Sequence, residues 1–143
     1  MWTWYSVRKN LISFSEQEPK LINDTIEYNL KLNGNELCKS KLVDFAEILN
    51  MTDFLETATL DFEINEKNTN TSGGEKQKIS ILRALYRDTP VMIFDEPTSA
   101  LDLQSSEKFM NYLEQIKDNR IILIITHDEG IIQRCNSIVR LGY

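Results

Sequence analysis

The sequence predicts an α/β fold built on a parallel sheet. Two apolar runs without alternation, VMIFD at Val91–Asp95 and IILIIT at Ile121–Thr126, have the composition of strands buried on both faces of such a sheet. A helical pattern over Leu103–Lys117 separates them. After a short helix capped by Asp128, SIVRL at Ser137–Leu141 predicts a last strand. Strand, helix, strand, helix, strand is the order typical of parallel α/β sheets.

The chain before Val91 predicts one strand and then mostly helices. NLISFS at residues 10–15 alternates apolar and polar side chains like a strand, and Pro19 lies soon after it. Apolar residues at helical spacing predict a helix around residues 42–49 and a second, short helix around residues 51–55. Residues 63–71 are polar and rich in Asn, which predicts a loop.

A longer helix is predicted to begin at Ser72. Ser72 and Glu75, three residues apart, have the pattern of a capping box, and Ile79, Leu82 and Tyr86 share one face of the helix that follows. The sequence DTP ends this helix just before the VMIFD strand. We therefore expect one domain over residues 1–143. Its mostly helical part is residues 26–87, and residues 1–25 and 88–143 form the α/β core.

Composition excludes several classes of function. A formal net charge of −6 argues against a nucleic-acid surface, and the longest apolar runs are far too short to span a bilayer. No signal peptide opens the chain, so we expect any membrane role to come through a partner. Cys38 and Cys135 lie far apart, and the chain has one His, which predicts a reduced intracellular protein without a structural zinc.

Acidic residues stand where a strand is predicted to end. Asp95 closes the VMIFD run and Glu96 follows it, and ligands of open α/β sheets bind at this carboxyl edge. Asp95 has the chemistry to hold Mg²⁺, directly or through water, and Glu96 to activate a water molecule as a general base. Gly73 and Gly74 open the predicted helix after Ser72, where bare backbone N–H groups can approach a phosphate.

Five motifs in order resemble those of one family. TSGGE at residues 71–75 is similar to the signature of ABC transporter ATP-binding domains, VMIFDEP to their Walker B strand, and SALD at residues 99–102 to their D-loop. His127 matches the switch histidine and Gln17 the Q-loop. The resemblance implies a P-loop NTPase-like (RecA-like) parallel sheet, here incomplete, with the helical subdomain inserted between Q-loop and signature.

The resemblance also implies roles for individual residues, with ATP and Mg²⁺ as the ligands. It assigns catalysis to Glu96, His127 and Gln17; nucleotide binding to Ser72, Gly73, Gly74, Glu75 and Asp102; and Mg²⁺ to Asp95 and Gln17. The switch histidine would hydrogen-bond the γ-phosphate and orient Glu96 with its water. Thr71 and Glu75 replace the Leu and Gln of the usual signature LSGGQ. Glu75 would add negative charge near a nucleotide, and it can instead fold back as the capping-box acid.

The run QEPKLINDTIEYNL at residues 17–30 resembles the corresponding run of exporter-type domains. Exporters usually carry Gly-Glu-x-Gly just before the signature, whereas this chain has Asn65-Glu66-Lys67-Asn68. Asn is the next-best residue for left-handed backbone, so the replacement is physically tolerable. The partners implied are a transmembrane domain and a second ATP-binding domain, with no nucleic acid, and the implied location is cytoplasmic, at the inner face of the cell membrane.

The phosphate-binding motif G-x-x-x-x-G-K-[ST] is absent, since none of the five glycines is followed by Lys. Only sixteen residues precede Gln17, too few to hold this Walker A loop in the family's spacing. We therefore expect a truncated domain whose signature closes over ATP bound by a second, head-to-tail domain. Alone, the chain is expected to be inactive, and either to self-associate or to have a rearranged sheet edge, because open apolar edges invite pairing. In the second case SIVRL closes up against the other strands or stays loose.

Three functions remain open from the sequence. The first is the ATPase of a membrane exporter, which couples hydrolysis to transport. The second is a non-catalytic remnant or regulatory fragment that presents only the signature face. The third is an ABC-type chromosome or DNA-repair ATPase. Such proteins insert long coiled coils between Q-loop and signature, and the short insert here, without sustained heptads, argues against it.

Overall fold

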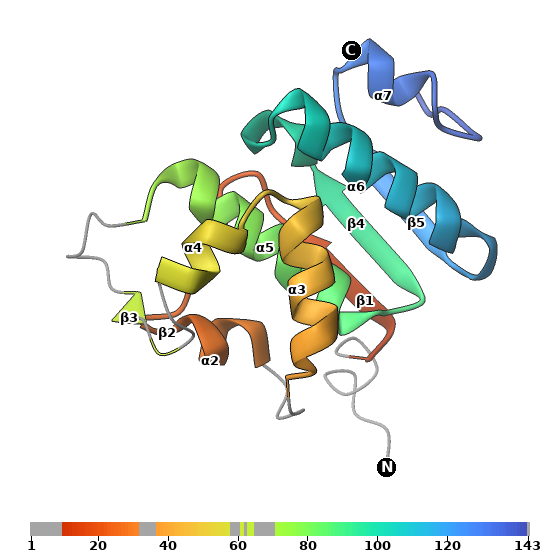
Figure 1. Cartoon of the computed structure of the whole chain (residues 1–143). Helices are drawn as coiled ribbons and strands as arrows, with labels where there is room; N and C mark the ends of the chain where they lie inside the picture. The colour runs from red at the N-terminus through yellow and green to blue at the C-terminus, as the bar shows by residue number, and fades with distance from the viewer. Residues whose placement is uncertain (1–9, 32–36, 58–60, 62, 65–70, 143) are drawn as a thin grey trace.

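The computed structural model describes residues 10–31, 37–57, 61, 63–64 and 71–142. Its centre is a parallel sheet in the order β1 (Ile12–Ser15), β4 (Val91–Asp95), β5 (Ile121–Ile125). In register, Ile12 lies beside Val91, and Val91 beside Ile121. Three segments far apart in the sequence therefore lie side by side, as predicted (Figure 1).

Helices dominate the segment between β1 and β4. In chain order the elements are β2 (Asp24–Thr25), α2 (Ile26–Lys31), α3 (Lys39–Ile48), α4 (Thr52–Thr57), β3 (Glu63–Ile64) and α5 (Gly73–Arg87). The predicted helices are confirmed. The predicted loop is wrong at residues 63 and 64, which pair antiparallel with β2, because buried Ile64 gives the polar stretch an apolar anchor. Residues 65–70, with the Asn65–Asn68 segment, lie outside the described residues.

The second half of the chain alternates strand and helix. β4 is followed by η1 (Pro97–Ala100) and α6 (Leu103–Ile116), then by η2 (Lys117–Asn119) and β5, and α7 (Glu129–Ile132) follows β5. The helix predicted over residues 103–117 is confirmed, with its last residue in η2. No helix in the described part of the chain is long and apolar enough to cross a membrane.

One face of the sheet is covered by helices. Ser13, Ser15, Met92 and Phe94 occupy alternate positions on this face and are fully buried. α5 packs chiefly on β1, and α6 lies across β4 and β5 (Figure 1). The ring of Phe94 meets that of Phe109, on α6, edge to face at 5.2 Å between centroids. The core of the molecule therefore lies between this face and the helices.

The other face of the sheet, which we call the open face, is covered by none of the described helices. Its rows carry exposed apolar side chains: Ile12, Phe14, Ile121, Leu123 and Ile125. The prediction that Ile121–Thr126 is buried on both faces is therefore wrong. The described helices that cover the sheet all lie on the opposite face, that of Met92 and Phe94. Alternate side chains of β5 therefore meet solvent. Within the described residues, β1 and β5 form the two edges.

The predicted last strand at Ser137–Leu141 is also wrong. These residues are exposed and belong to no ladder, with Val139 83% and Leu141 90% exposed. Just before this segment, the guanidinium of Arg134 donates to three α6 side chains: Glu107 at 3.0 Å, Asn111 at 2.6 Å and Glu114 at 2.8 Å. An apolar segment forms a strand only where it pairs with a neighbouring strand, and residues 137–141 pair with none in the described part of the chain.

Candidate functional site

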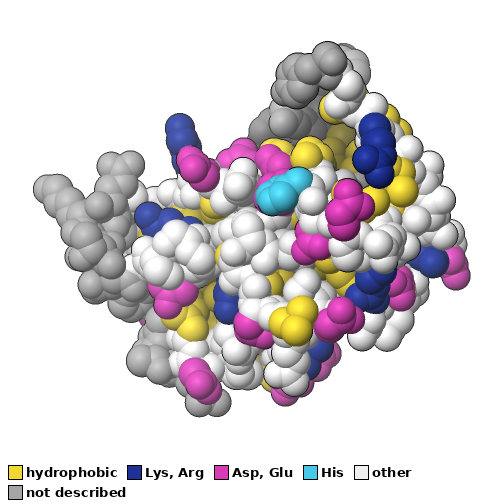
Figure 2. Space-filling view, turned by 90° about the horizontal axis from the view of Figure 1, so that it is seen from above, with side chains coloured by type: hydrophobic (Ala, Val, Ile, Leu, Met, Phe, Trp, Pro, Cys, Tyr) yellow, Lys and Arg dark blue, Asp and Glu magenta, His cyan; other side chains and the backbone are white. Residues whose placement is uncertain are grey.

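The carboxyl ends of β4 and β5 bring together the acidic pair and the histidine. Asp95 is the last residue of β4, Glu96 follows it, and His127 lies two residues beyond the end of β5. Because the two strands are parallel neighbours, these side chains share one edge of the sheet. Acidic side chains gather around the histidine on the face seen in Figure 2.

Glu96 has an unusual backbone conformation. Its φ of 46° and ψ of 48° are left-handed, which costs a non-glycine residue about 1–3 kcal/mol and persists only where surrounding contacts enforce it. The N–H of Glu96 donates to the carbonyl of Ile125 at 2.9 Å. Its carbonyl accepts from Gln77 Nε2 at 2.9 Å, and Ser99 Oγ lies 2.8 Å away. The backbone of Glu96 is thus fixed from β5, α5 and η1.

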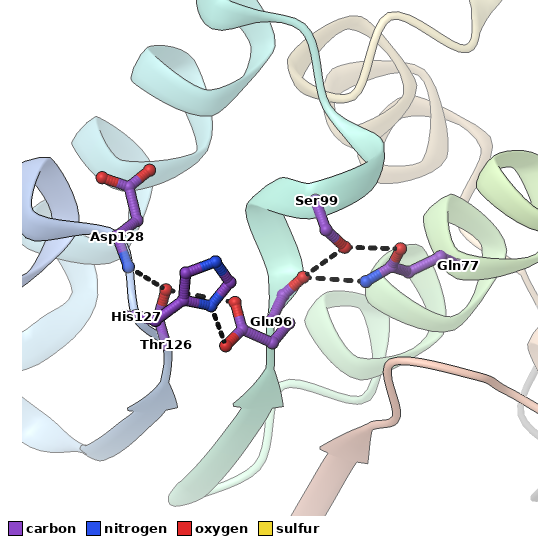
Figure 3. A network of polar contacts seen from close by, with 6 residues as sticks. All are labelled: Gln77, Glu96, Ser99, Thr126, His127 and Asp128. Atoms are coloured by element: carbon purple, nitrogen blue, oxygen red, sulfur yellow. Dashed lines mark hydrogen bonds and ion pairs between the residues drawn. The ribbon is translucent and has the colours of Figure 1, made fainter.

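The side chain of Glu96 points toward the residues after β5 (Figure 3). Its Oε1 lies 2.7 Å from His127 Nδ1, and its Oε2 accepts from Thr126 Oγ1 at 3.3 Å. The hydrogen bond and charge of Glu96 raise the pKa of His127 above its ordinary 6.5. The carboxylate is mostly buried, at 15% exposure, while the His127 side chain is 90% exposed. His127 Nε2 is therefore open to a ligand above this edge.

Asp95 fits the role of a magnesium-binding carboxylate. Among the described residues its carboxylate makes no hydrogen bond or ion pair, so these oxygens are available, and the residue is half-buried at the strand end. The described residues contain no group of three His, Cys, Asp or Glu side chains that could hold a metal ion. Mg²⁺ needs no such cage, because it is usually held by one or two carboxylates together with water and substrate phosphates.

The amino end of α5 leaves its glycines bare. Ser72 and Glu75 form the predicted capping box, in which Ser72 N–H donates to Glu75 Oε2 at 2.6 Å and Glu75 N–H donates to Ser72 Oγ at 3.2 Å. A Cβ added at Gly73 would meet nothing within 4 Å, and one at Gly74 only Ala100, at 3.9 Å. Nothing within the described chain therefore requires glycine here, which leaves room for a group from outside.

Residues 2–99 match the sequence profile of the family described as ABC transporter. This match covers more than half of the chain. The chain belongs to the ABC transporter family. The predicted fold class is thereby confirmed, since ATP-binding domains of this family have the P-loop NTPase fold.

Proteins similar to this chain include an ABC transporter, a flippase and a solved ABC exporter. It is 33% identical over 93% of its length to ABC transporter B family member 6 of Dictyostelium discoideum, of which it covers 20%. It is 34% identical over 92% of its length to an ATP-dependent lipid A-core flippase of Shewanella frigidimarina, covering 22% of it. A solved bacterial Atm1-family ABC exporter with ATP bound gives a TM-score of 0.73 at 27% identity, over 90% of this chain and 23% of the exporter chain. The chain thus spans about a fifth of the length of these proteins.

Two predicted site residues, Asp102 and Gln17, make no hydrogen bond or ion pair with Glu96 or His127 in the described structure. Asp102 caps α6: its carboxylate accepts from Ser105 N–H at 2.9 Å and Ser105 Oγ at 2.8 Å, and these bonds lower its pKa to about 2. Asn50 Nδ2, at the end of α3, also donates to it at 3.3 Å. Gln17 is exposed, two residues beyond β1. β4, the strand beside β1, ends at Asp95, so Gln17 follows its strand at the same edge of the sheet.

Sequence reasoning assigned no role to three residues that contact Glu96. These are Gln77, Ser99 and Thr126. A signal for Gln77 was present, because a glutamine on the buried face of a helix needs polar partners. Ser99 lies within the D-loop resemblance, and Thr126 directly precedes the switch histidine, so their positions also pointed to the site.

Proposed function

We propose that this chain is part of the ATP-binding domain of an ABC exporter and contributes to two different ATP molecules. Its sheet edge supplies the residues that hydrolyse one ATP, and the amino end of α5 closes over the phosphate of another, held by a second domain. The observation that carries the proposal is the Glu96–His127 pair at the carboxyl edge of β4 and β5. The bare glycines at the start of α5 support its second half.

The chemistry proposed for the edge follows from its geometry. Glu96 would take a proton from the attacking water as general base, in a position fixed by His127 and Thr126. His127 Nδ1 is engaged by Glu96, which leaves Nε2 to donate to the γ-phosphate. When bound, Mg²⁺ would neutralise phosphate charge, and Asp95, with Gln17, would hold it directly or through water. Ser72, Gly73 and Gly74 would bind the other phosphate mainly through backbone N–H groups.

Two predicted nucleotide contacts take a modified form in this proposal. Glu75 turns its carboxylate back onto Ser72, and so keeps its charge in the capping box. Asp102 has both carboxylate oxygens engaged in capping α6, so we propose that it orders the D-loop instead of contacting ATP through its side chain.

Residues 26–87 would form the helical subdomain, and residues 1–25 and 88–143 would belong to the ATP-binding core.

The partners proposed are a transmembrane domain and a second ATP-binding domain, with the chain on the cytoplasmic side of the cell membrane. The 143 residues contain no Walker A motif. We therefore propose that a polypeptide limited to these residues binds MgATP weakly and hydrolyses none, because the Walker A backbone and lysine supply most phosphate contacts. Its open sheet face and free β5 edge would favour self-association, which light scattering over a range of concentrations would detect.

The test of this function is Glu96→Gln in a complete protein that carries this segment behind a Walker A loop. An amide cannot accept the proton from water, so we expect ATP turnover to fall about 10²–10⁴-fold while ATP binding persists. Glu47→Gln, the same change at an exposed position on α3, is the matched control. Near wild-type turnover in the Glu96 variant would remove Glu96 from the role of general base.

A further inference from the structure

Gln77 is a polar residue on the buried side of α5. It is 5% exposed, in a helix whose neighbouring residues Ile79, Ile81 and Leu82 are fully buried. A buried amide is costly unless both of its ends find partners. Its Nε2 donates to the carbonyl of Glu96 at 2.9 Å, and its Oε1 lies 3.0 Å from Ser99 Oγ (Figure 3).

The two contacts of Gln77 converge on the backbone of Glu96. Ser99 Oγ lies 2.8 Å from the Glu96 carbonyl and 3.0 Å from Gln77 Oε1, so its single proton serves one acceptor at a time. Two donors to this carbonyl do not alternate: Gln77 Nε2 at 2.9 Å and the backbone N–H of Ser99 at 3.2 Å. Of these, only Gln77 holds Glu96 from another element, α5. Glu96 has positive φ, and the direction of its side chain depends on that conformation being held.

We propose that Gln77 is a positioning residue that holds the left-handed backbone of Glu96 and so sets its carboxylate against His127. Gln77 lies one helical turn beyond Gly73, the first residue of α5. This part of the inference rests on the proposed function: a phosphate that contacts the amino end of α5 would displace a helix directly bonded to the general base of the other ATP site. Gln77 would thus connect the two sites within one chain.

The experiment uses the chain itself and its single histidine. His127 gives the only imidazole resonances in a proton NMR titration, and its pKa reports the distance of the Glu96 carboxylate. Gln77→Met keeps the length of the side chain and its burial but removes both polar contacts. Ser80→Ala on the same helix is the control, since Ser80 Oγ is buried with no hydrogen-bond partner in the described structure. No nucleotide is needed, so the result is independent of the Glu96→Gln turnover test.

We expect the pKa of His127 to lie above 6.5 in the wild type and in Ser80→Ala, and to fall toward 6.5 in Gln77→Met. Asp128, which also raises this pKa, is unchanged in all three chains and accounts for any remaining elevation. If Gln77→Met does not fold, exposed Ser99→Ala removes the hydroxyl contact to the same carbonyl and leaves the backbone N–H contact of residue 99, so a smaller fall is expected. An unchanged pKa in the folded variant that is measured would overturn the proposal.

Discussion

The amino end of α5 and the carboxyl edge of the sheet serve the proposed function in different ways. At the start of α5, the side chains of Ser72 and Glu75 each accept from the other residue's backbone N–H, and the glycines between them present only backbone. At the sheet edge, Glu96 depends on contacts from α5, η1 and the segment after β5. The first region is assembled within one helical turn, and the second only by the tertiary fold.

Their structural support differs as well. α5 is anchored by fully buried side chains, among them Ile79, Leu82 and Leu85. His127 follows β5, whose outer face exposes Ile121, Leu123 and Ile125 by 50–59%. Local assembly on a packed helix makes the signature end independent of the open face. The acid–base pair instead inherits the weaker support of a half-covered edge strand.

The largest expected effect is loss of the closed dimer on changing Gly73→Asp in a complete protein. The Cβ meets no atom of the described chain, and an acid in the first turn of a helix favours the helix by about 0.3–1 kcal/mol, so the fold should be kept. A carboxylate in front of the α5 amides would repel the phosphate that must approach them. Cross-linking or scattering with ATP present would measure dimer closure.

Gly142→Asp is the matched control for this change, because the surroundings of Gly142 are equally open and it lies outside both regions. It should leave closure intact. A Gly73→Asp protein that still forms the ATP-dependent closed dimer would show that the start of α5 is no phosphate site.

The next effect compares the two faces of the sheet through the stability of the isolated chain. Phe94 is fully buried against Phe109, so Phe94→Ala should lower the free energy of unfolding by about 3–5 kcal/mol. Leu123 is 50% exposed, and Leu123→Ala should cost about 1 kcal/mol or less. Urea unfolding at a dilution where the chain is monomeric measures both. Equal losses would mean that the face described as open is covered in solution.

Residue patterns predicted much of this arrangement. The apolar runs located β4 and β5, and Ser72 with Glu75 located the start of α5. The runs did not say which face of β5 is covered, because that depends on where the helices pack. SIVRL has the composition of a strand, but its conformation depends on whether a neighbouring strand is within reach.

At the candidate site, too, residue patterns located the residues but not the contacts between them. Asp95, Glu96 and His127 were predicted from strand ends and from the family resemblance. Glu96 has a left-handed φ, and its carbonyl is held by a hydrogen bond from Gln77. This bond joins residues nineteen positions apart, one on α5 and the other directly after β4. No local pattern encodes such a contact.

The smallest expected effect is the pH dependence of the Glu96–His127 pair. Because folding raises the pKa of His127, the pair stabilises the fold fully below the unfolded pKa of about 6.5, and this contribution disappears as pH rises through the folded value. The unfolding free energy of the wild type should therefore exceed that of His127→Ala by more at about pH 6 than at about pH 9. A difference that is equal at both pH values, or larger at the higher one, would contradict the pairing.

The most direct test of the central claim, that the two regions serve different ATP molecules, is single-turnover hydrolysis in mixed dimers of complete ATP-binding domains. In one dimer, one domain carries Gly73→Asp and its partner Glu96→Gln, and in the other dimer both changes lie in the same domain opposite a wild-type partner. If signature and general base act on different nucleotides, the first dimer keeps one intact site and hydrolyses its ATP, while the second has none and hydrolyses no ATP. The reverse pattern, with turnover only when both changes share a domain, would show that one domain builds its whole site alone and would contradict the account.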